Sequence, residues 1–231
     1  MTVQLHPETD LLVDYSAGSL SPALCVSITA HLHFCDQCRS QQDELLSFGG
    51  NLFEKIAPQE MQENSFASVL SSIASDVNLS DVNLGDAHSV DVNSSDVNSS
   101  SVADTANLPR FLQKLVPKPQ FNFLTCSLKV AKIAIGEDRY ELALHKIRAG
   151  GNTPKHDHNG VEVTVVLYGS FSDKEGVYNE GDFIVRNPGD VHSPLASLGD
   201  ECICLSVVEA PIRLVGPILR MINPFLSFNP S

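Results

Sequence analysis

The spacing of apolar residues is helical in the first part of the chain, from residue 9 to about residue 75. Leu11, Leu12 and Tyr15 fall near one stripe, as they would on the buried face of a helix. Ser21-Pro22 places an N-cap residue before a proline at the first helical position, which predicts that a second helix begins there. The segment is expected to form three or four helices. The second runs from Pro22 to about His33, and the third from Asp36 to Phe48, where Gly49-Gly50 ends it. The fourth runs from Pro58 to Ile73.

A short repeat follows the helical segment. Asp recurs every five residues from Asp76 to Asp96, and Asp-Val-Asn stands at four of these five positions. A pentapeptide β-helix is one interpretation, but five copies make little more than one coil, and two of them offer only serine where an apolar residue would face a core. Because the segment has so little to bury, residues 76–106 are predicted to be a flexible acidic linker.

From Phe121 the spacing of apolar residues changes to a period of two, which is typical of β-strands. Turns rich in glycine and proline separate the runs, as in an antiparallel sandwich or a small barrel. The predicted fold class is α + β with two domains, a small helical bundle in residues 1–75 and an antiparallel β-barrel or jelly roll in residues 107–231. The expected strand runs are Phe123–Ile135, Arg139–Ile147, Val161–Tyr168, Asp182–Val185 and Cys202–Val208.

The acidic residues are concentrated in the first two segments. The 231 residues include 28 acids and 15 bases, for a formal net charge of −13. Residues 1–75 hold nine acids against two bases, the linker holds six Asp and no base, and the remaining residues hold thirteen of each. This balance disfavours direct binding to the nucleic acid backbone and favours a protein partner with a basic surface. The asymmetry also indicates two units with different roles.

Neither end of the chain has the pattern of a secretion signal or a membrane span. The first six residues lack a basic region followed by an apolar one, and three prolines and two arginines interrupt the apolar tail from Ala210 to Pro230. We therefore expect a cytoplasmic protein that does not contact a membrane. In that compartment the six cysteines indicate thiols and metal ligands more than a disulfide framework.

His31, Cys35 and Cys38 are spaced to converge on one metal ion. If the chain is helical here, His31 and Cys35 lie on one face at i and i+4, and Cys38 can close the same side. Zn²⁺ takes four such nitrogen and sulfur ligands in a tetrahedron. The fourth could be His6 or His33, and His6 is favoured because a residue two positions from His31 points elsewhere on a helix. A redox pair of cysteines is the alternative, but thioredoxin-type motifs sit in a βαβ context that is absent here.

A second group of metal-binding residue types lies in the β segment. His156 and His158 share a face if the chain is extended, Glu162 keeps the same parity, and His192 can enter from another strand. Three imidazoles and one carboxylate suit Zn, Mn, Fe or Ni, so the expectation is zinc or another divalent transition metal. Cys202-Ile-Cys204 also has same-face spacing, and its residues are either buried core thiols or a redox pair.

The two groups together resemble a known family. His6 with His31-x3-Cys35-x2-Cys38 is similar to the zinc-binding anti-sigma domain, in which these four positions hold zinc. The stretches Gly150 to Gly169 and Gly181 to His192 resemble the two cupin motifs, although the proline of the second falls one place later than in the usual Pro-x-Gly spacing. The combination makes the chain most similar to the ChrR-type anti-sigma factors.

The resemblance implies that the helical domain binds and occludes an extracytoplasmic-function sigma factor. It further implies that the cupin domain releases this sigma factor in response to singlet oxygen or related oxidants, so that the chain is a transcription regulator and not an enzyme. The rival hypothesis is a cupin-type metal-dependent dioxygenase or oxidoreductase, because a site of histidines and one carboxylate can bind iron with positions open for oxygen. The regulator is favoured because the enzyme leaves the zinc motif and the charge asymmetry unexplained.

Overall fold

The computed structural model describes residues 3–57, 65–76 and 107–215. Contacts divide the chain into two compact units, one formed by Met1–Ser47 with Asn98–Ser231 and the other by Phe48–Val97. The first helices therefore belong to the same unit as the β segment. Apart from Asp76, the predicted linker lies outside the described residues, and the domain boundaries at 75/76 and 106/107 remain a prediction.

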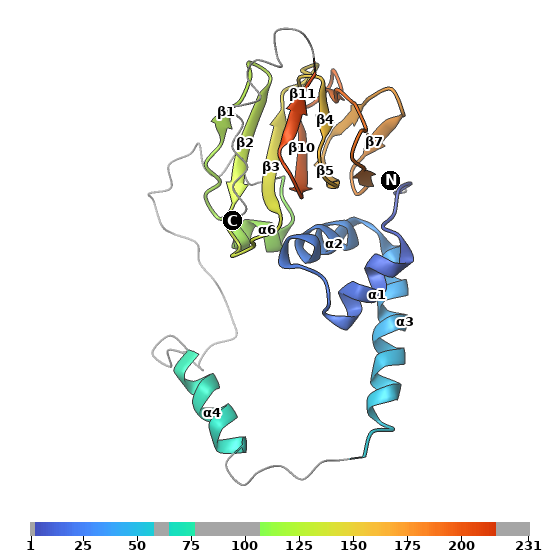
Figure 1. Cartoon of the computed structure of the whole chain (residues 1–231), viewed down its shortest axis with the longest axis vertical. Coiled ribbons are helices and arrows are strands. Elements are labelled where there is room, and N and C mark those ends of the chain that lie inside the picture. The colour runs from blue at the N-terminus through green and yellow to red at the C-terminus, as the bar shows by residue number, and fades with distance from the viewer. Residues whose placement is uncertain (1–2, 58–64, 77–106, 216–231) are drawn as a thin grey trace, which may run out of the picture. The chain divides into compact units, whose positions relative to one another are not determined.

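The N-terminal part is helical, as the apolar spacing predicts. The second helix begins at Pro22 with Ser21 as its N-cap, the predicted position. The helices are α1 Thr9–Ala17, α2 Pro22–Phe34, α3 Asp36–Phe53, α4 Ser65–Asp76 and α6 Arg110–Leu115, all labelled in Figure 1. Within the described ranges, no single helix is long and apolar enough to cross a membrane, and only the bent pair α1 and α2, taken together, meets those criteria.

The ends of two helices differ from the prediction. The expected stop at Gly49-Gly50 is wrong, because α3 continues through both glycines to Phe53. Neither glycine adopts a positive φ, and a glycine inside a helix costs only about 1 kcal/mol relative to alanine. Gly18 does end α1, because it takes the left-handed conformation with a φ of 71°. For α4, the predicted start at Pro58 lies outside the described residues, and the helix extends three residues beyond Ile73.

In the described part of the C-terminal segment, residues 107–215, every strand pair is antiparallel, as predicted. The large sheet has the order β1-β2-β3-β10-β5-β8, and two small sheets have the orders β11-β4 and β7-β6-β9. Figure 1 labels the first five strands of the large sheet. The interpretation of Phe123–Ile135 as one strand is wrong, because the chain folds back and pairs Phe123 with Lys129. The strands are β1 Asn122–Phe123, β2 Leu128–Ile133, β3 Glu141–Ile147, β4 His156–His158, β5 Glu162–Tyr168, β6 Ser170–Ser172, β7 Val177–Asn179, β8 Phe183–Arg186, β9 Leu195–Ala196, β10 Cys202–Val208 and β11 Ile212–Leu214.

The central strands of the large sheet bury both of their faces. On β10, Leu205 and Val207 belong to the same apolar core as Leu12 of α1 and Ile28 of α2. Cys204, which alternates with them along the strand, faces a cavity on the other side of the sheet. Helix α2 packs against β5 and β10. Helices α1 and α2 therefore pack on one face of the sheet, while its other face lines the cavity.

Candidate metal centres

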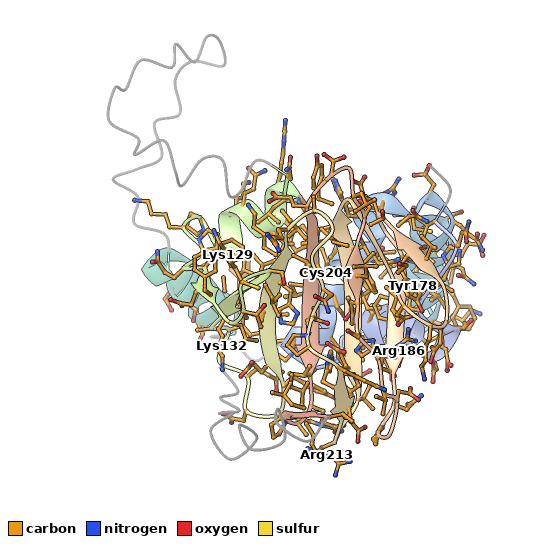
Figure 2. All side chains as sticks on the ribbon, turned by 90° about the horizontal axis from the view of Figure 1, so that it is seen from above. Lys129, Lys132, Tyr178, Arg186, Cys204 and Arg213 are labelled. Carbon is orange, nitrogen blue, oxygen red and sulfur yellow. The ribbon has the colours of Figure 1, made fainter. Side chains whose placement is uncertain are left out.

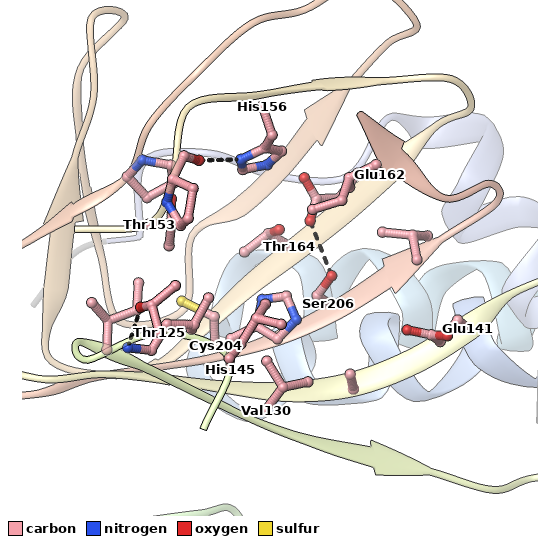
Figure 3. Close-up of a pocket in the computed structure, with 18 of the residues that line it drawn as sticks. Thr125, Val130, Glu141, His145, Thr153, His156, Glu162, Thr164, Cys204 and Ser206 are labelled. Carbon is pink, nitrogen blue, oxygen red and sulfur yellow. Dashed lines mark hydrogen bonds between the residues drawn. The ribbon is translucent and has the colours of Figure 1, made fainter. Parts of the chain in front are cut away.

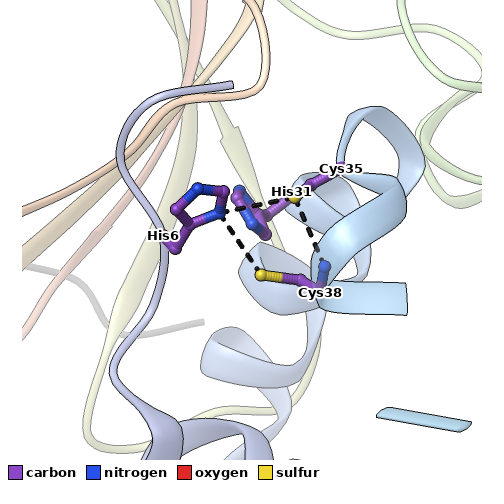
Figure 4. Close-up of side chains that lie close together, drawn as sticks. All are labelled: His6, His31, Cys35 and Cys38. Atoms are coloured by element: carbon purple, nitrogen blue, oxygen red, sulfur yellow. Dashed lines mark hydrogen bonds between the residues drawn. The ribbon is translucent and has the colours of Figure 1, made fainter. Parts of the chain in front are cut away.

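The N-terminal cluster forms where α2 ends and α3 begins. Helix α2 carries His31, its C-cap Cys35 has extended backbone angles that redirect the chain, and Cys38 lies in the first turn of α3. The segment before α1 brings His6 to the same point, with its Nδ1 atom 3.4 Å from each of the two Sγ atoms. The four possible ligand atoms lie within 4.8 Å of one another. Figure 4 shows the four side chains pointing toward a common point. The structure therefore brings together the four residues that the sequence singles out.

His33, the alternative fourth residue, does not join this cluster. Its side chain is exposed, and its ring packs edge-on against Phe34 with ring centroids 4.9 Å apart. The i+2 position on α2 therefore places it on another face from His31, as expected for a helix.

The hydrogen bonding of His31 fits a metal ligand. Its Nδ1 lies 2.7 Å from the carbonyl oxygen of Gly181 and therefore carries the hydrogen that it donates, which leaves Nε2 unprotonated. Nε2 is buried and has no hydrogen-bond partner in the described part of the chain. Burial lowers the pKa of His31, although the bond to Gly181 acts in the opposite direction, so the imidazole is neutral at pH 7. A neutral imidazole with an unshared lone pair beside two sulfur atoms is the arrangement that zinc requires.

The two thiols complete a donor set suited to a divalent cation. Burial, together with the neighbouring Cys35, raises the pKa of Cys38 to about 12, so the bare site holds a protonated thiol at neutral pH. A bound cation reverses this preference, because a coordinating thiol loses its proton. The backbone N–H of Cys38 already donates to Cys35 Sγ over 3.4 Å, which would stabilise a thiolate there. Two thiolates and two neutral imidazoles would neutralise one Zn²⁺ ion.

The second cluster lies inside the β domain. Strand β4 carries His156 and His158, β5 begins with Glu162, and His192 pairs with His156 through an isolated bridge. The Nε2 atom of His192 lies 2.9 Å from Nε2 of His156 and 3.0 Å from Nε2 of His158. Glu162 Oε2 lies 3.3 Å from His158 Nε2 and 3.7 Å from His192 Nε2. All four predicted residues therefore converge, and all four are buried.

The outer contacts of these histidines fit a cation at their centre. His156 Nδ1 lies 2.8 Å from the carbonyl oxygen of Pro154, and His192 Nδ1 lies 3.4 Å from Asp173 Oδ2, so each Nδ1 carries the hydrogen. The two Nε2 atoms then face each other as lone pairs at a distance where they repel. Glu162 Oε2 accepts no hydrogen bond from any described residue. A metal ion bound between these atoms would remove the repulsion and satisfy the carboxylate.

The charge states favour the same interpretation. Burial lowers the pKa of His192 to about 4, although the nearby carboxylate of Glu162 acts in the opposite direction. Burial raises the pKa of Glu162, but His158, His156 and His192 outweigh this effect and the net shift is downward. Burial also lowers the pKa of His158, so His158 and His192 are neutral imidazoles beside the ionised Glu162 at neutral pH. Together with His156 they form a set of three imidazoles and one carboxylate, which suits divalent transition metals.

Comparison with known proteins finds a family match in the β segment and a relative that matches nearly the whole chain. Residues 129–210 match the family described as the ChrR cupin-like domain. Over 225 residues the sequence is 28% identical to the anti-sigma-E factor ChrR of Cereibacter sphaeroides, and the match covers 97% of this chain and 99% of that protein. The chain is a ChrR homologue.

A solved structure supports the same relationship. The fold matches a chain in the crystal structure of Rhodobacter sphaeroides SigE in complex with the anti-sigma ChrR, with a TM-score of 0.68, 28% identity, and coverage of 90% of this chain and 99% of that chain. The predicted family and fold class of this ChrR homologue are thereby confirmed, with a helical N-terminal region and an antiparallel cupin domain. The named relative is a regulator, which supports the prediction that the chain is not an enzyme.

Sequence reasoning missed the residues that hold His192 of this ChrR homologue. Asp173 Oδ2, which faces His192, also accepts a hydrogen bond of 2.9 Å from Arg186, and the Tyr178 hydroxyl donates to the other carboxylate oxygen over 3.0 Å. Arg186 and Tyr178 lie side by side in Figure 2 and are bonded over 2.6 Å. A carboxylate behind a histidine ligand fixes the orientation of the ring. No spacing rule could identify Asp173, because it follows β6 whereas His192 lies in an isolated bridge 19 residues further along the chain.

The cupin cluster opens into a cavity of about 640 Å³, shown in Figure 3. His156, Glu162 and His192 line the cavity, and so does Ser206, whose hydroxyl donates to Glu162 Oε1 over 3.0 Å. His145 of β3 lines it too, although the sequence assigned this residue no role, and burial lowers its pKa. The metal group is therefore accessible from a space large enough for a small molecule.

Cys202 and Cys204 lie on one face of β10, as their spacing predicts. Their Sγ atoms are 3.6 Å apart and both side chains are buried. The contact with Cys202 and burial raise the pKa of Cys204 well above its usual value, which favours the unreactive thiol. These properties agree with the interpretation of both residues as core thiols.

Proposed function

We propose that this chain is an anti-sigma factor that binds and inhibits an extracytoplasmic-function sigma factor. The observation that carries the proposal is the match, along nearly the whole of both chains, to ChrR as found in complex with SigE. The proposed partner acts on RNA polymerase, so the proposed place of action is the cytoplasm, without direct binding to nucleic acid.

An exposed apolar surface on the helices supports a protein partner. On α4, Phe66, Val69 and Leu70 lie at i, i+3 and i+4, on one face, and each is about half exposed or more, with Phe66 at 64%. In the C-terminal half of α3, Phe48 and Phe53 are exposed at 63% and 78%. Large apolar side chains in such numbers favour an interaction site.

Charge supports a basic partner. Residues 1–75 hold nine acids against two bases, whereas residues 107–231 are balanced. A sigma factor binds DNA and so presents basic faces, which an acidic helical segment complements. On this proposal residues 1–75 carry the inhibitory interaction, the acidic repeat of residues 76–106 is a linker, and residues 107–231 form the regulatory domain.

The two metal clusters receive different proposed roles. His6, His31, Cys35 and Cys38 would hold zinc, whose bonds would fix the junction of α2 and α3. His156, His158, Glu162 and His192 would hold zinc or another divalent transition metal in the cupin domain. We further propose that this domain responds to singlet oxygen or related oxidants, as in an oxidative stress response, and that the response releases the sigma factor.

Co-expression tests the proposal directly. The chain is expressed with an extracytoplasmic-function sigma factor from the same genome and purified through a tag on the chain. We expect a stoichiometric complex that contains metal and represses sigma-dependent transcription in vitro. Absence of a complex, together with oxygen uptake that depends on an added organic substrate, would instead support the cupin oxidoreductase.

The apolar face of α4 gives a sharper test of the interface. Replacing Phe66 and Leu70 with alanine is expected to weaken sigma binding roughly 10- to 1,000-fold, because buried aromatic and apolar anchors carry most interface energy. The fold should not change, since both side chains are exposed. Leu198→Ala is the control, because Leu198 is an exposed apolar residue of the β domain, with 90% of its surface accessible. Equal affinity of the double variant and the control would exclude α4 from the interface.

A further inference from the structure

Three consecutive residues of the cupin domain contact the N-terminal metal cluster or the segment next to it: Gly181 and Phe183 contact His31, and Asp182 bonds to the residues before His6. Gly181 and Asp182 lie in the turn between β7 and β8, and Phe183 is the first residue of β8. The carbonyl oxygen of Gly181 accepts the 2.7 Å hydrogen bond from His31 Nδ1, and the Phe183 ring lies edge-on to the His31 imidazole with centroids 5.8 Å apart. Both the tautomer and the orientation of this histidine are therefore set by the cupin domain.

Asp182 holds the segment that carries His6. Its Oδ1 accepts hydrogen bonds from the backbone N–H groups of Gln4, at 2.8 Å, and Leu5, at 3.1 Å. The backbone N–H of Phe183 in turn donates to the carbonyl oxygen of Leu5 over 3.0 Å. The residue directly before His6 is thus bonded to the cupin turn through both its N–H and its C=O.

The turn lies very close to the helical segment, and Gly181 makes this possible. Gly181 has a φ of +89°, and a Cβ atom there would lie 2.6 Å from Phe34 Cβ and 2.7 Å from Val3 Cγ2. Glycine is therefore required both for the backbone conformation and for the space between the cupin and the helical segment. Asp182 is 1% exposed, so its bonds to Gln4 and Leu5 form away from competing water.

We propose that this turn is the outer part of the N-terminal metal site and that Asp182 is a positioning residue for His6. The inference rests on the proposed occupation of the cluster by a metal. The helical segment supplies all four ligands, but the cupin domain supplies the hydrogen bonds that orient two of them. Metal affinity in the inhibitory segment then depends on the conformation of the regulatory domain.

Strand β8 connects the turn to the cupin metal cluster. It begins at the turn with Phe183 and ends at Arg186, which is bonded to Asp173 behind His192. Neighbouring β5 pairs with it so that Glu162 faces Arg186 at one end and Val165 faces Phe183 at the other. Because β8 connects the turn to Arg186, a rearrangement around the cupin cluster would shift β8 and with it the turn.

The test measures metal binding by the full-length chain. Cobalt(II) is the first probe, because its thiolate charge-transfer band reports the cysteine-containing cluster alone; the cupin group contains no cysteine. Zinc is the second probe, and its affinity is measured by competition with a chelator. Two variants change Asp182. Asp182→Ala removes the acceptor, and Asp182→Asn keeps an oxygen that can accept from Gln4 and Leu5. The control is Glu180→Gln, because in the described structure the Glu180 carboxylate bonds only to the Gly169 N–H of the cupin domain.

We expect zinc affinity to fall about 10- to 100-fold in Asp182→Ala, as for other outer-shell substitutions, with an altered cobalt spectrum. Asp182→Asn should give an intermediate loss and Glu180→Gln none. Thermal unfolding of the metal-free proteins separates this role from a structural one, which would lower stability and leave zinc affinity unchanged. Wild-type affinity in Asp182→Ala would overturn the inference alone. Absence of the thiolate band in the wild type would overturn the proposed metal site, and the inference with it.

Discussion

Replacing Cys35 or Cys38 with alanine is expected to abolish repression in the absence of any inducing signal. Each substitution removes one of two thiolates, and structural zinc sites contribute about 10–16 kcal/mol in small zinc-dependent modules at pH 7. Helix α3 has 18 residues, yet the only one it buries is Cys38, so little apolar packing holds it without the metal. Helix α2 buries six residues against its neighbours and should remain in place. We therefore expect α3 to detach locally rather than the chain to unfold.

A sigma-dependent reporter and metal analysis check this result. Output without inducer should rise to the level of a strain that lacks the chain, and the purified variant should lose one equivalent of zinc. Cys25→Ala is the control, because Cys25 is partly buried on α2 and its thiol contacts the Leu20 carbonyl rather than the cluster. Full repression by a zinc-free Cys38→Ala variant would show that the metal does not maintain the inhibitory surface.

The clusters could be predicted from sequence because helix and strand periodicity act over short distances. His31 lies in α2 and Cys35 is its C-cap, so the predicted i, i+4 relation is confirmed. His156 and His158 both lie in β4, so their shared face is also confirmed. His6 and His192 come from segments distant in sequence, and only the chemistry of the donor set connected them to their partners. Local spacing therefore predicted three residues of each site, and coordination preference added the fourth, His6 or His192.

The packing of the helices on the sheet was missed, although the sequence holds a signal for it. The run Cys202–Val208 is apolar at six of its seven positions, with Ser206 the exception, whereas a strand with one face in water alternates. In the structure its first six residues are all buried, because helices cover one face and the cavity lies behind the other. The hydrogen bonds of Asp182 could not be predicted from the sequence. They join residues far apart along the chain, so no regular spacing of residues indicates them.

Replacing His158 with alanine or Glu162 with glutamine is expected to give a repressor that cannot be switched off. His158→Ala removes a ligand from the cupin group, and Glu162→Gln replaces its anionic ligand with a neutral amide. Both residues lie inside a β domain whose core includes two apolar clusters. That core should survive the loss of one metal, so α3, α4 and the N-terminal cluster should keep their structure and sigma binding should be unchanged. The metal-dependent response to oxidants should be lost.

The measurement is reporter induction by singlet oxygen, with sigma affinity and cupin metal content determined on the same variants. Glu141→Gln is the matched control, because Glu141 is a carboxylate that lines the same cavity but pairs with Lys132 and lies outside the metal group. The control should be induced like the wild type. Constitutive output from the His158→Ala variant would show that the cupin metal maintains sigma binding itself, and normal induction would show that the response does not pass through this site. Either result would end the proposed division between an inhibitory N-terminal segment and a sensory cupin domain.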